Sequence, residues 1–421
     1  MKINQEISLE SDMPFQVVWQ MTMHWEVDLH AVLSVRGLLK NDRESQIWKH
    51  DYRGTKIKIW LNDKDILFWG IIQAVDLKRN HGIIECFIKS VSASALFDQE
   101  NEKIYRAFQN PNQRYSYIVK TIAEEQSGNV ICTVGDEEIK RPLIAYGETR
   151  WEFLKRLASH HGSCLLADVI TGKPNFWFGM RMGRRIQEKL EEAVMPMKIQ
   201  KTYERNEAGE TIKTYIWKSE HYYMIGDWTY LKGRKYTIYM ADVQLEQGQL
   251  VFRYQFREMN KTEIKYNKTF TGRSLWGTVE ERNEEGVKVS LDIGQEKGEY
   301  YYPWKPETGN ALYAIPEIGS RVAVYFSDSD ERKGIAVRCI GKEGKEKQTE
   351  EKKFSVPKEA MITLAEGEMI LSKREEKIIL EDSRNIGFYG NKIEIRANGK
   401  IKMRAKKIVL SSSTELKAVT E

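Results

Sequence analysis

The end of the chain, from about residue 360 onward, constrains the fold more than any other segment. Residues 392–410 read KIEIRANGKIKMRAKKIVL, and apolar residues alternate there with charged ones. Such alternation is typical of short strands that bury one face only. Breaks such as residues 397–399 separate the runs, so each strand is too short to close a core with its own neighbours. The apolar faces of these strands therefore need a partner.

The same pattern recurs through the tail every seven to eight residues or so, which indicates a short-period array and not a globular core. A lone array of this kind leaves backbone N–H and C=O groups unpaired. Three intertwined copies would pair each strand with a strand of a neighbouring chain and bring the apolar side chains together on one axis. We therefore expect an intertwined trimeric β-prism or β-helix over residues 360–421. Its expected axial core residues are Ile362, Leu364, Ile370, Ile378, Leu380, Ile386, Phe388, Ile393, Ile395, Ile401, Met403, Ile408 and Leu410.

Length, composition and charge limit the number of domains and the class of protein to which the chain can belong. A chain of 421 residues has room for roughly two to four domains. Hydrophobic residues make up 41% and charged residues 30% of the sequence, a balance that favours folded domains over disorder. The net charge of +5 is small for this length, so charge by itself does not imply a nucleic-acid partner.

Cysteines, histidines and apolar runs indicate the compartment and the chemistry. The four cysteines lie far apart without CxxC spacing, which favours idle thiols in a reducing compartment. The N-terminus lacks the apolar region of a signal peptide, and no apolar run approaches the roughly 20 residues that span a bilayer. All seven histidines lie at or before His221, so the tail cannot build a histidine-ligated metal site. We expect no catalytic residues, no metal and no cofactor.

The first 270 residues alternate between strand-like and helix-like patterns. Strand periodicity dominates residues 1–95, where KIKIWLNDKDILFWGIIQAV predicts a hairpin. Residues 112–128 and 149–162 place apolar side chains at helical spacing, and each segment ends in a glycine. Thr149 followed three residues later by Glu152 predicts a capping box at the start of the second helix.

The remaining organisation follows from changes of pattern. Residues 271–342 contain five short strand patterns, which suit a small barrel of the OB type. Residues 343–359 are charged and lack periodicity, as expected of an exposed linker. The sequence thus predicts a mainly β protein with a few helices, an OB-fold, a linker and the repetitive β tail.

Three segments resemble one known protein family. LIAYGETRWEFLKRLASHHGSCLLAD is similar to the hub segment of VgrG proteins and phage late-control-D-like proteins, and YRAFQNPNQRYSYIVKTIAEE is similar to the segment before it. YYYPWKPETGNALYAIPEIGSRVAVYF resembles the OB-fold module of the same proteins. The matching positions are Tyr146, Glu148, Phe153, Leu154, Arg156, Leu157 and Gly162 in the hub segment, and Pro316, Glu317, Gly319, Val322, Val324 and Phe326 in the OB module.

The resemblance covers most of the chain and implies the baseplate hub and cell-puncturing spike of a contractile injection system, as in phage tails, tailocins and type VI secretion. It implies a hub over residues 1–270 with two β-barrel-like subdomains and inserted helices, an OB domain over 271–342, the linker 343–359 and the spike 360–421. It also implies a homotrimer whose pseudo-sixfold hub meets a hexameric tail-tube protein.

Further expectations about partners and location follow from the resemblance. Baseplate components and a tip protein of the PAAR type are implied partners, with no specific nucleic acid. The implied protein is structural and not an enzyme. It assembles in the cytoplasm, forms part of a phage-tail-like particle or secretion apparatus, and contacts the target membrane transiently on firing. Because the sequence stops at residue 421, we expect no appended effector or lysozyme domain.

Two other classes of function stay open at this point. The chain is alternatively an OB-fold protein that binds nucleic acid or polysaccharide through an oligomerising tail, or an envelope-degrading enzyme on a trimeric β scaffold. Tyr300, Tyr301, Tyr302 and Trp304 are residue types that stack bases in OB-folds, but the resemblance and the modest net charge favour a role in a barrel core and a trimer interface. No G-x-S-x-G elbow or phosphate-binding loop is present in the sequence.

Two polar clusters have structural interpretations that we favour over metal sites. His160 and His161 follow the second helix without a carboxylate or cysteine at ligand spacing, so we expect a role near the C-terminal dipole of that helix. The segment SDSDE, which contains Asp328, Asp330 and Glu331, lacks the glycine and the terminal glutamate of a calcium loop. We expect this segment to be a polar connection between strands.

Overall fold

The computed structural model describes residues 7–411 except 41–43, 188–197, 203–211, 247, 260–261, 295, 308–313, 341–351 and 357–359. About 49% of the chain is strand and 11% is helix, which confirms the mainly β class. The chain divides into two compact units, residues 1–342 and 343–421, which are described separately. In the described segments, the helices are too short or too polar to cross a bilayer.

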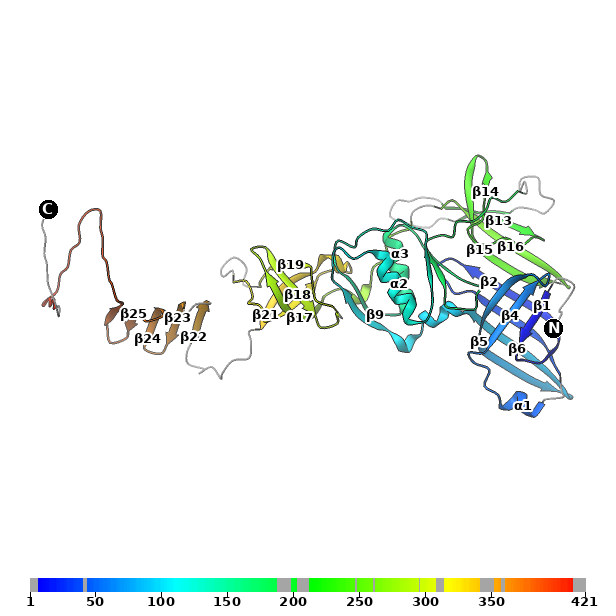
Figure 1. Ribbon diagram of the computed structural model, residues 1–421, viewed down its shortest axis with the longest axis horizontal. Coiled ribbons are helices and arrows are strands. Elements are labelled where there is room, and N and C mark those ends of the chain that lie inside the picture. The colour runs from blue at the N-terminus through cyan, green and yellow to red at the C-terminus, as the bar shows by residue number, and fades with distance from the viewer. Residues whose placement is uncertain are drawn as a thin grey trace. The chain divides into compact units, whose positions relative to one another are not determined.

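Eleven strands of the described residues form one curled sheet in the first unit (Figure 1). The strand order is β1-β4-β5-β6-β3-β2-β15-β16-β13-β12, with β14 paired to β15. The hairpin expected near residues 56–75 is formed by β4 and β5. The bounds are β1 (Ile7–Ser11), β2 (Phe15–Glu26), β3 (Val32–Leu39), α1 (Glu44–Lys49), β4 (Lys56–Leu61), β5 (Asp65–Asn80), β6 (Ile83–Ser92), β12 (Lys198–Thr202), β13 (Ile212–Ser219), β14 (Trp228–Leu231), β15 (Arg234–Glu246) and β16 (Gln249–Arg257).

This sheet consists of two halves with the same strand arrangement. Strands β2, β3, β6 and β5 pair in antiparallel order on one side, and β15, β16, β13 and β12 pair in antiparallel order on the other. The halves meet where β2 pairs with β15, with Asp242 opposite His24 and Met240 opposite Glu26. Backbone hydrogen bonds between β2 and β15 therefore make the two halves one continuous sheet.

A helical module lies between the two halves in the sequence. The two predicted helices are confirmed as α2 and α3, and their apolar faces contribute to one buried cluster. The predicted capping box is present, because Glu152 N donates to Thr149 Oγ1 at 3.1 Å and Thr149 N donates to the Glu152 carboxylate at 2.9 Å. The module contains η2 (Ala93–Phe97), η3 (Glu100–Glu102), β7 (Ile104–Phe108), α2 (Tyr115–Glu125), β8 (Val130–Cys132), β9 (Leu143–Glu148), α3 (Arg150–His160), β10 (Leu165–Ala167) and β11 (Phe176–Phe178).

A small barrel follows at the position expected for the OB-fold. Its strand order is β19-β18-β17-β20-β21, and all these pairings are antiparallel. A bridge between Trp304 and Ala336 brings the β19 side against β21 and closes the barrel. The elements are η4 (Lys268–Phe270), β17 (Arg273–Arg282), β18 (Gly286–Leu291), β19 (Tyr301–Pro303), β20 (Arg321–Phe326), η5 (Glu331–Lys333) and β21 (Ile335–Ile340).

The second unit contains the tail, in which five strands form an antiparallel meander within one chain. The bounds are β22 (Lys352–Val356), β23 (Ala360–Ala365), β24 (Glu368–Lys373), β25 (Glu376–Glu381) and β26 (Ile386–Tyr389).

Two details of the tail differ from the sequence-based expectation. The first strands of the tail were expected to pair between chains. In the single chain, β22 to β26 pair with one another instead, because loops of two residues such as 366–367 allow hairpins. Residues 390–411 form no strand, although strands were predicted there. The predicted linker 343–359 lies outside the described residues except for the part that forms β22.

An ion pair lies on the line where the two halves of the hub sheet meet. His24 Nδ1 is 2.7 Å from Asp242 Oδ1 on the neighbouring strand, and His24 Nε2 is 3.4 Å from Glu26 Oε2. The hydrogen bond to Asp242, followed by that to Glu26, raises the pKa of His24 from 6.5 to about 9. The imidazole is therefore protonated at neutral pH and holds two carboxylates at the seam.

We expect the hub to lose stability as the pH rises from about 6.5 to 9. The folded-state pKa of His24 lies above that of an unfolded histidine, so its contribution is complete below about pH 6.5 and is lost as pH rises through the folded value. Thermal unfolding of the wild type and of His24→Gln over this range measures the effect. The variant should flatten the pH dependence. The exposed His50 provides the control, and a profile changed equally by His50→Gln would contradict the assignment.

Candidate functional site

The hub motif residues position a buried arginine. Glu148 ends β9 and Arg156 lies in the middle of α3, and the capping box fixes the start of this helix between them. The Arg156 side chain is 2% exposed. Its Nη2 donates to Glu148 Oε1 at 2.5 Å and to the Ile144 carbonyl at 2.9 Å, and its Nε donates to Glu148 Oε2 at 3.2 Å. This bidentate geometry is the strong form of an arginine–carboxylate pair.

The second carboxylate on Arg156 comes from the OB domain. Glu331 begins η5 between β20 and β21, is 2% exposed, and accepts a hydrogen bond from Arg156 Nη1. The segment SDSDE is a connection between strands, as expected, but its glutamate points into the hub and not into solvent. The sequence alone does not predict this role, because no local pattern distinguishes Glu331 from the acidic residues beside it.

Burial and neighbouring charge set the ionisation of this cluster. Burial opposes the charge on Arg156, but Glu331 and Glu148 together hold its pKa above the usual range. Burial raises the pKa of Glu148, although Arg156 counteracts this effect. One cation therefore serves two carboxylates in a dry environment, and loss of the guanidinium would leave both without a counter-ion.

His160 was expected to act near the C-terminal dipole of α3, but its surroundings give it a different role. Burial, followed by the nearby charges of Arg156 and Arg332, lowers the pKa of His160 to about 3. The imidazole is thus neutral at physiological pH and cannot interact with the helix dipole as a cation. Instead, its Nδ1 lies 3.0 Å from the Tyr115 hydroxyl, which links the end of α3 to the start of α2.

Gln109, in the motif before α2, makes a second buried link between hub and OB domain. Its side chain is 2% exposed. Gln109 Nε2 donates to the Val289 carbonyl at 2.7 Å and to the Tyr302 hydroxyl at 3.2 Å, and its Oε1 accepts from Leu291 N at 3.1 Å. One side chain thus bonds both the backbone of β18 and an aromatic residue of the barrel core. Tyr302 is fully buried, so it is not exposed for base stacking.

The other motif residues pack in the core or allow the backbone to turn. Gly162 and Gly319 have φ values of +62° and +82°, which glycine adopts at little cost. Tyr146 packs edge-on against Phe270 at 5.7 Å between ring centroids. Pro316 is buried, whereas the Glu317 side chain is exposed and its carbonyl accepts from Ser320 N. The fully buried positions are Phe153, Leu154, Leu157, Val322, Val324 and Phe326.

The tail meander presents an apolar face. Strand register places Ile362 opposite Leu371, Leu371 opposite Ile378, and Ile378 opposite Phe388, so these side chains lie on one side of the sheet. They remain between 37% and 60% exposed in the single chain. The described residues of this face are Ile362, Leu364, Met369, Leu371, Ile378, Leu380, Ile386 and Phe388.

One expected axial residue lies on the other side of this sheet. Ile370 is opposite Thr363 and Ile379, so its side chain points away from the apolar face. Its neighbours Met369 and Leu371 occupy the face instead. Within the single chain, Ile370 therefore lies on the side of the meander opposite to that of its neighbours Met369 and Leu371.

The last described residues of the tail are more exposed still. The six axial residues expected after the meander are between 50% and 70% exposed in the single chain. Scattered apolar residues on a surface are ordinary, but a continuous series of this kind marks an interaction surface. These residues are Ile393, Ile395, Ile401, Met403, Ile408 and Leu410. Within the described part of the chain, no group of three or more His, Cys, Asp or Glu is arranged to hold a metal.

These features define a hub-and-spike fold: a curled two-part sheet, a helical module, an OB barrel and a repetitive β tail. No protein-family model matches the sequence. No curated protein matches it either. Solved structures do match, and they show that the chain has the fold of VgrG-like hub and spike proteins, as the sequence motifs predicted.

Three solved structures illustrate the likeness. The E. coli c3393 protein, described as a type VI secretion component similar to the T4 tail proteins gp27 and gp5, matches with a TM-score of 0.54 at 12% identity over 78% of this chain and 99% of its own. A lidless PdpA–VgrG complex matches at 0.55 and 8% identity, over 88% and 93%. The lidded Francisella PdpA–VgrG complex matches at 0.54 and 9% identity, over 88% and 76%.

We expect Arg156→Met to destabilise the first unit by about 3–5 kcal/mol, because it leaves two buried carboxylates without a counter-ion. Urea unfolding at fixed protein concentration measures the change. Lys120→Met is the control, since Lys120 makes an exposed ion pair with Glu124 on α2 and should cost about 0.5 kcal/mol or less. Equal losses in the two variants would show that the buried cluster has no special role in stability.

Proposed function

We propose that this chain is the structural hub-spike of a contractile injection system and acts as a homotrimer that links a tail tube to a membrane-piercing tip. The single observation that carries the proposal is the apolar series along the tail, which a lone chain leaves exposed. The hub-and-spike fold supports the same role, since the similar solved structures include a type VI secretion component and VgrG complexes.

Three copies would give the tail the core that one copy lacks. Burial of one Leu or Ile side chain contributes about 1.5–3 kcal/mol relative to exposure, and each apolar layer of a trimer would gain this from three chains. Charged residues on the opposite side of the strands would keep the rod soluble and limit sideways association. We leave Ile370 out of the proposed core, because its register in the single chain places it on the other side of the meander.

The other parts of the chain receive roles that agree with this proposal. Residues 1–270 would form the hub, whose two sheet halves would give a trimer six similar units facing a hexameric tail-tube protein. The OB domain 271–342 and linker 343–359 would connect this hub to the spike 360–421. Baseplate components and a PAAR-like tip protein are the proposed partners. No enzymatic step is needed for this task, and the proposed location is an assembled particle delivered from the cytoplasm to a target envelope.

We expect the purified chain to have three times the 49.2 kDa mass of one copy at micromolar concentration. Light scattering coupled to size-exclusion chromatography measures this directly. A monomer would contradict the proposal. Salt-sensitive oligonucleotide binding would instead favour an OB-type binding protein, and hydrolysis of peptidoglycan above background would favour an enzyme.

A pair of neighbouring variants tests which face of the meander is buried. Leu371 lies on the apolar face and Ser372 on the other. Leu371→Asp would bring three carboxylates together away from water, so we expect the tail to lose its resistance to limited proteolysis at pH 7. Ser372→Asp, the matched control, should leave the tail resistant. The reverse result would show that the proposed axis lies on the wrong side of the sheet.

A further inference from the structure

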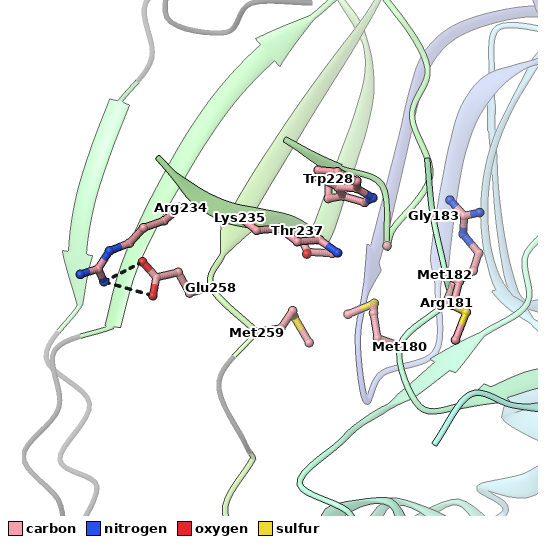
Figure 2. A pocket seen from close by; sticks show the side chains of 11 residues that line it. Met180, Arg181, Met182, Gly183, Trp228, Arg234, Lys235, Thr237, Glu258 and Met259 are labelled. Atoms are coloured by element: carbon pink, nitrogen blue, oxygen red, sulfur yellow. Dashed lines mark hydrogen bonds and ion pairs between the residues drawn. The ribbon is translucent and has the colours of Figure 1, made fainter. Parts of the chain in front are cut away.

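The second half of the hub sheet contains a pocket with a volume of about 930 Å³ (Figure 2). It lies where β15 and the start of β14 meet the segment after β11 and the residues that follow β16. The lining residues that matter most for its chemistry are Met180, Met182, Trp228, Lys235, Glu258 and Met259. None of these residues has a role in the proposed tail assembly.

The floor of the pocket is held in one conformation by close backbone contacts. A Cβ atom on Gly183 would lie 2.3 Å from the carbonyl of Gly226, so only glycine allows the two segments to meet. Asp227 fixes the same crossing, because its Oδ1 accepts from Arg181 Nη2 at 2.5 Å and from Arg184 N at 2.9 Å. The pocket is therefore preformed, as ligand-binding sites usually are.

Three methionines make part of the pocket wall apolar and adaptable. Met182 is 82% exposed and Met259 is 44% exposed, which is unusual for side chains of this type. Figure 2 shows that Met259 and Met180 come from separate segments. Methionine is flexible and polarisable, and binding surfaces use it to enclose apolar side chains of varied shape.

The acidic groups at the pocket are already paired. Glu258 accepts hydrogen bonds from Arg234 at 3.2 Å and from the Tyr236 hydroxyl at 2.8 Å. Asp227 is bound to Arg181, as described above. Both carboxylates therefore already have partners, and neither is free to bind a basic group of a ligand.

Lys235 in the pocket lining, and Arg184 and Arg185 beside it in the chain after Gly183, differ from the paired Arg181 and Arg234. Lys235 Nζ lies 4.4 Å from the centroid of the Trp228 ring, and Arg185 lies over the Tyr230 ring at 5.4 Å. Arg184, beside the floor glycine, is exposed. Among the described residues, none of these three cations has an acidic partner. The pocket thus combines three methionines with Lys235, and two further cations follow its lining segment in the chain.

We propose that this pocket binds a peptide segment of another protein that carries carboxylates on both sides of an apolar side chain. The apolar side chain enters between the methionines, and the carboxylates lie against Lys235 in the lining and against Arg184 and Arg185, which follow the lining residue Gly183 in the chain. Apolar burial supplies the affinity, and charge complementarity selects acidic segments and speeds their association. Such binding would not require the trimeric tail or the proposed hub-spike role.

Selection of random twelve-residue peptides displayed on phage, with the purified full chain as bait, tests this inference. We expect the enriched peptides to contain Asp or Glu around Leu, Phe or Met. A synthetic copy of an enriched peptide should bind the chain in fluorescence anisotropy. Both Lys235→Glu and Met182→Asp should weaken this binding at least tenfold, and added salt should weaken it further.

Matched controls separate the pocket from general surface effects. Lys305→Glu makes the same charge change on an exposed lysine of the OB domain and should leave peptide affinity unchanged. Met182 is so exposed that its substitution leaves the core intact, which circular dichroism verifies. Enrichment of basic or purely apolar peptides, or of none, would overturn the proposal, as would binding that the pocket variants do not affect. A lower oligomer mass for Met182→Asp would assign the pocket to a second copy of the chain and would also overturn it.

Discussion

One buried guanidinium determines how the largest parts of the first unit are joined. Arg156 binds Glu148, eight residues before it, and Glu331, 175 residues after it, and all three are nearly inaccessible to water. A buried cation is tolerated only when its charge and its donors are satisfied, so the cluster requires the hub and the OB domain to meet in one orientation. Gln109 imposes the same requirement through neutral hydrogen bonds to the barrel. A protein that transmits force from hub to spike would need such a rigid connection.

Sequence patterns predicted the structural features that depend on residues close together in the chain. The capping box at Thr149 and Glu152 was predictable because its two hydrogen bonds join residues three apart. The five barrel strands were predictable because alternation and turn residues are also local. The partnership of Arg156 with Glu331 was not predictable, because an acidic connection between strands has the same sequence pattern whether its side chains face water or a buried arginine. The pocket was missed for the same reason, since four separate segments contribute its walls.

In the tail, the hydropathy pattern of a strand does not by itself show which residues lie on which face of the sheet. Three consecutive apolar residues, Met369, Ile370 and Leu371, occupy β24, and hydropathy alone does not say which of them faces the core. The two-residue loop at 366–367 decides, because it places Leu364 opposite Met369 and so assigns odd-numbered residues of β24 to the face of even-numbered residues of β23. A change of one residue in loop length would reverse the face of the whole strand.

The meander and the residues that follow it differ in what they need in order to fold. Strands β22 to β26 pair with one another within one chain, whereas residues 390–411 form no strand in it. Ordering a residue costs about 1–2 kcal/mol in backbone entropy, and an extended segment with exposed apolar side chains has little to offset this cost. In the proposed trimer, burial of Ile393, Ile401 and Ile408 against their counterparts would supply the missing free energy. Formation of the distal spike would then be coupled to assembly, while the meander would provide the local structure from which that assembly begins.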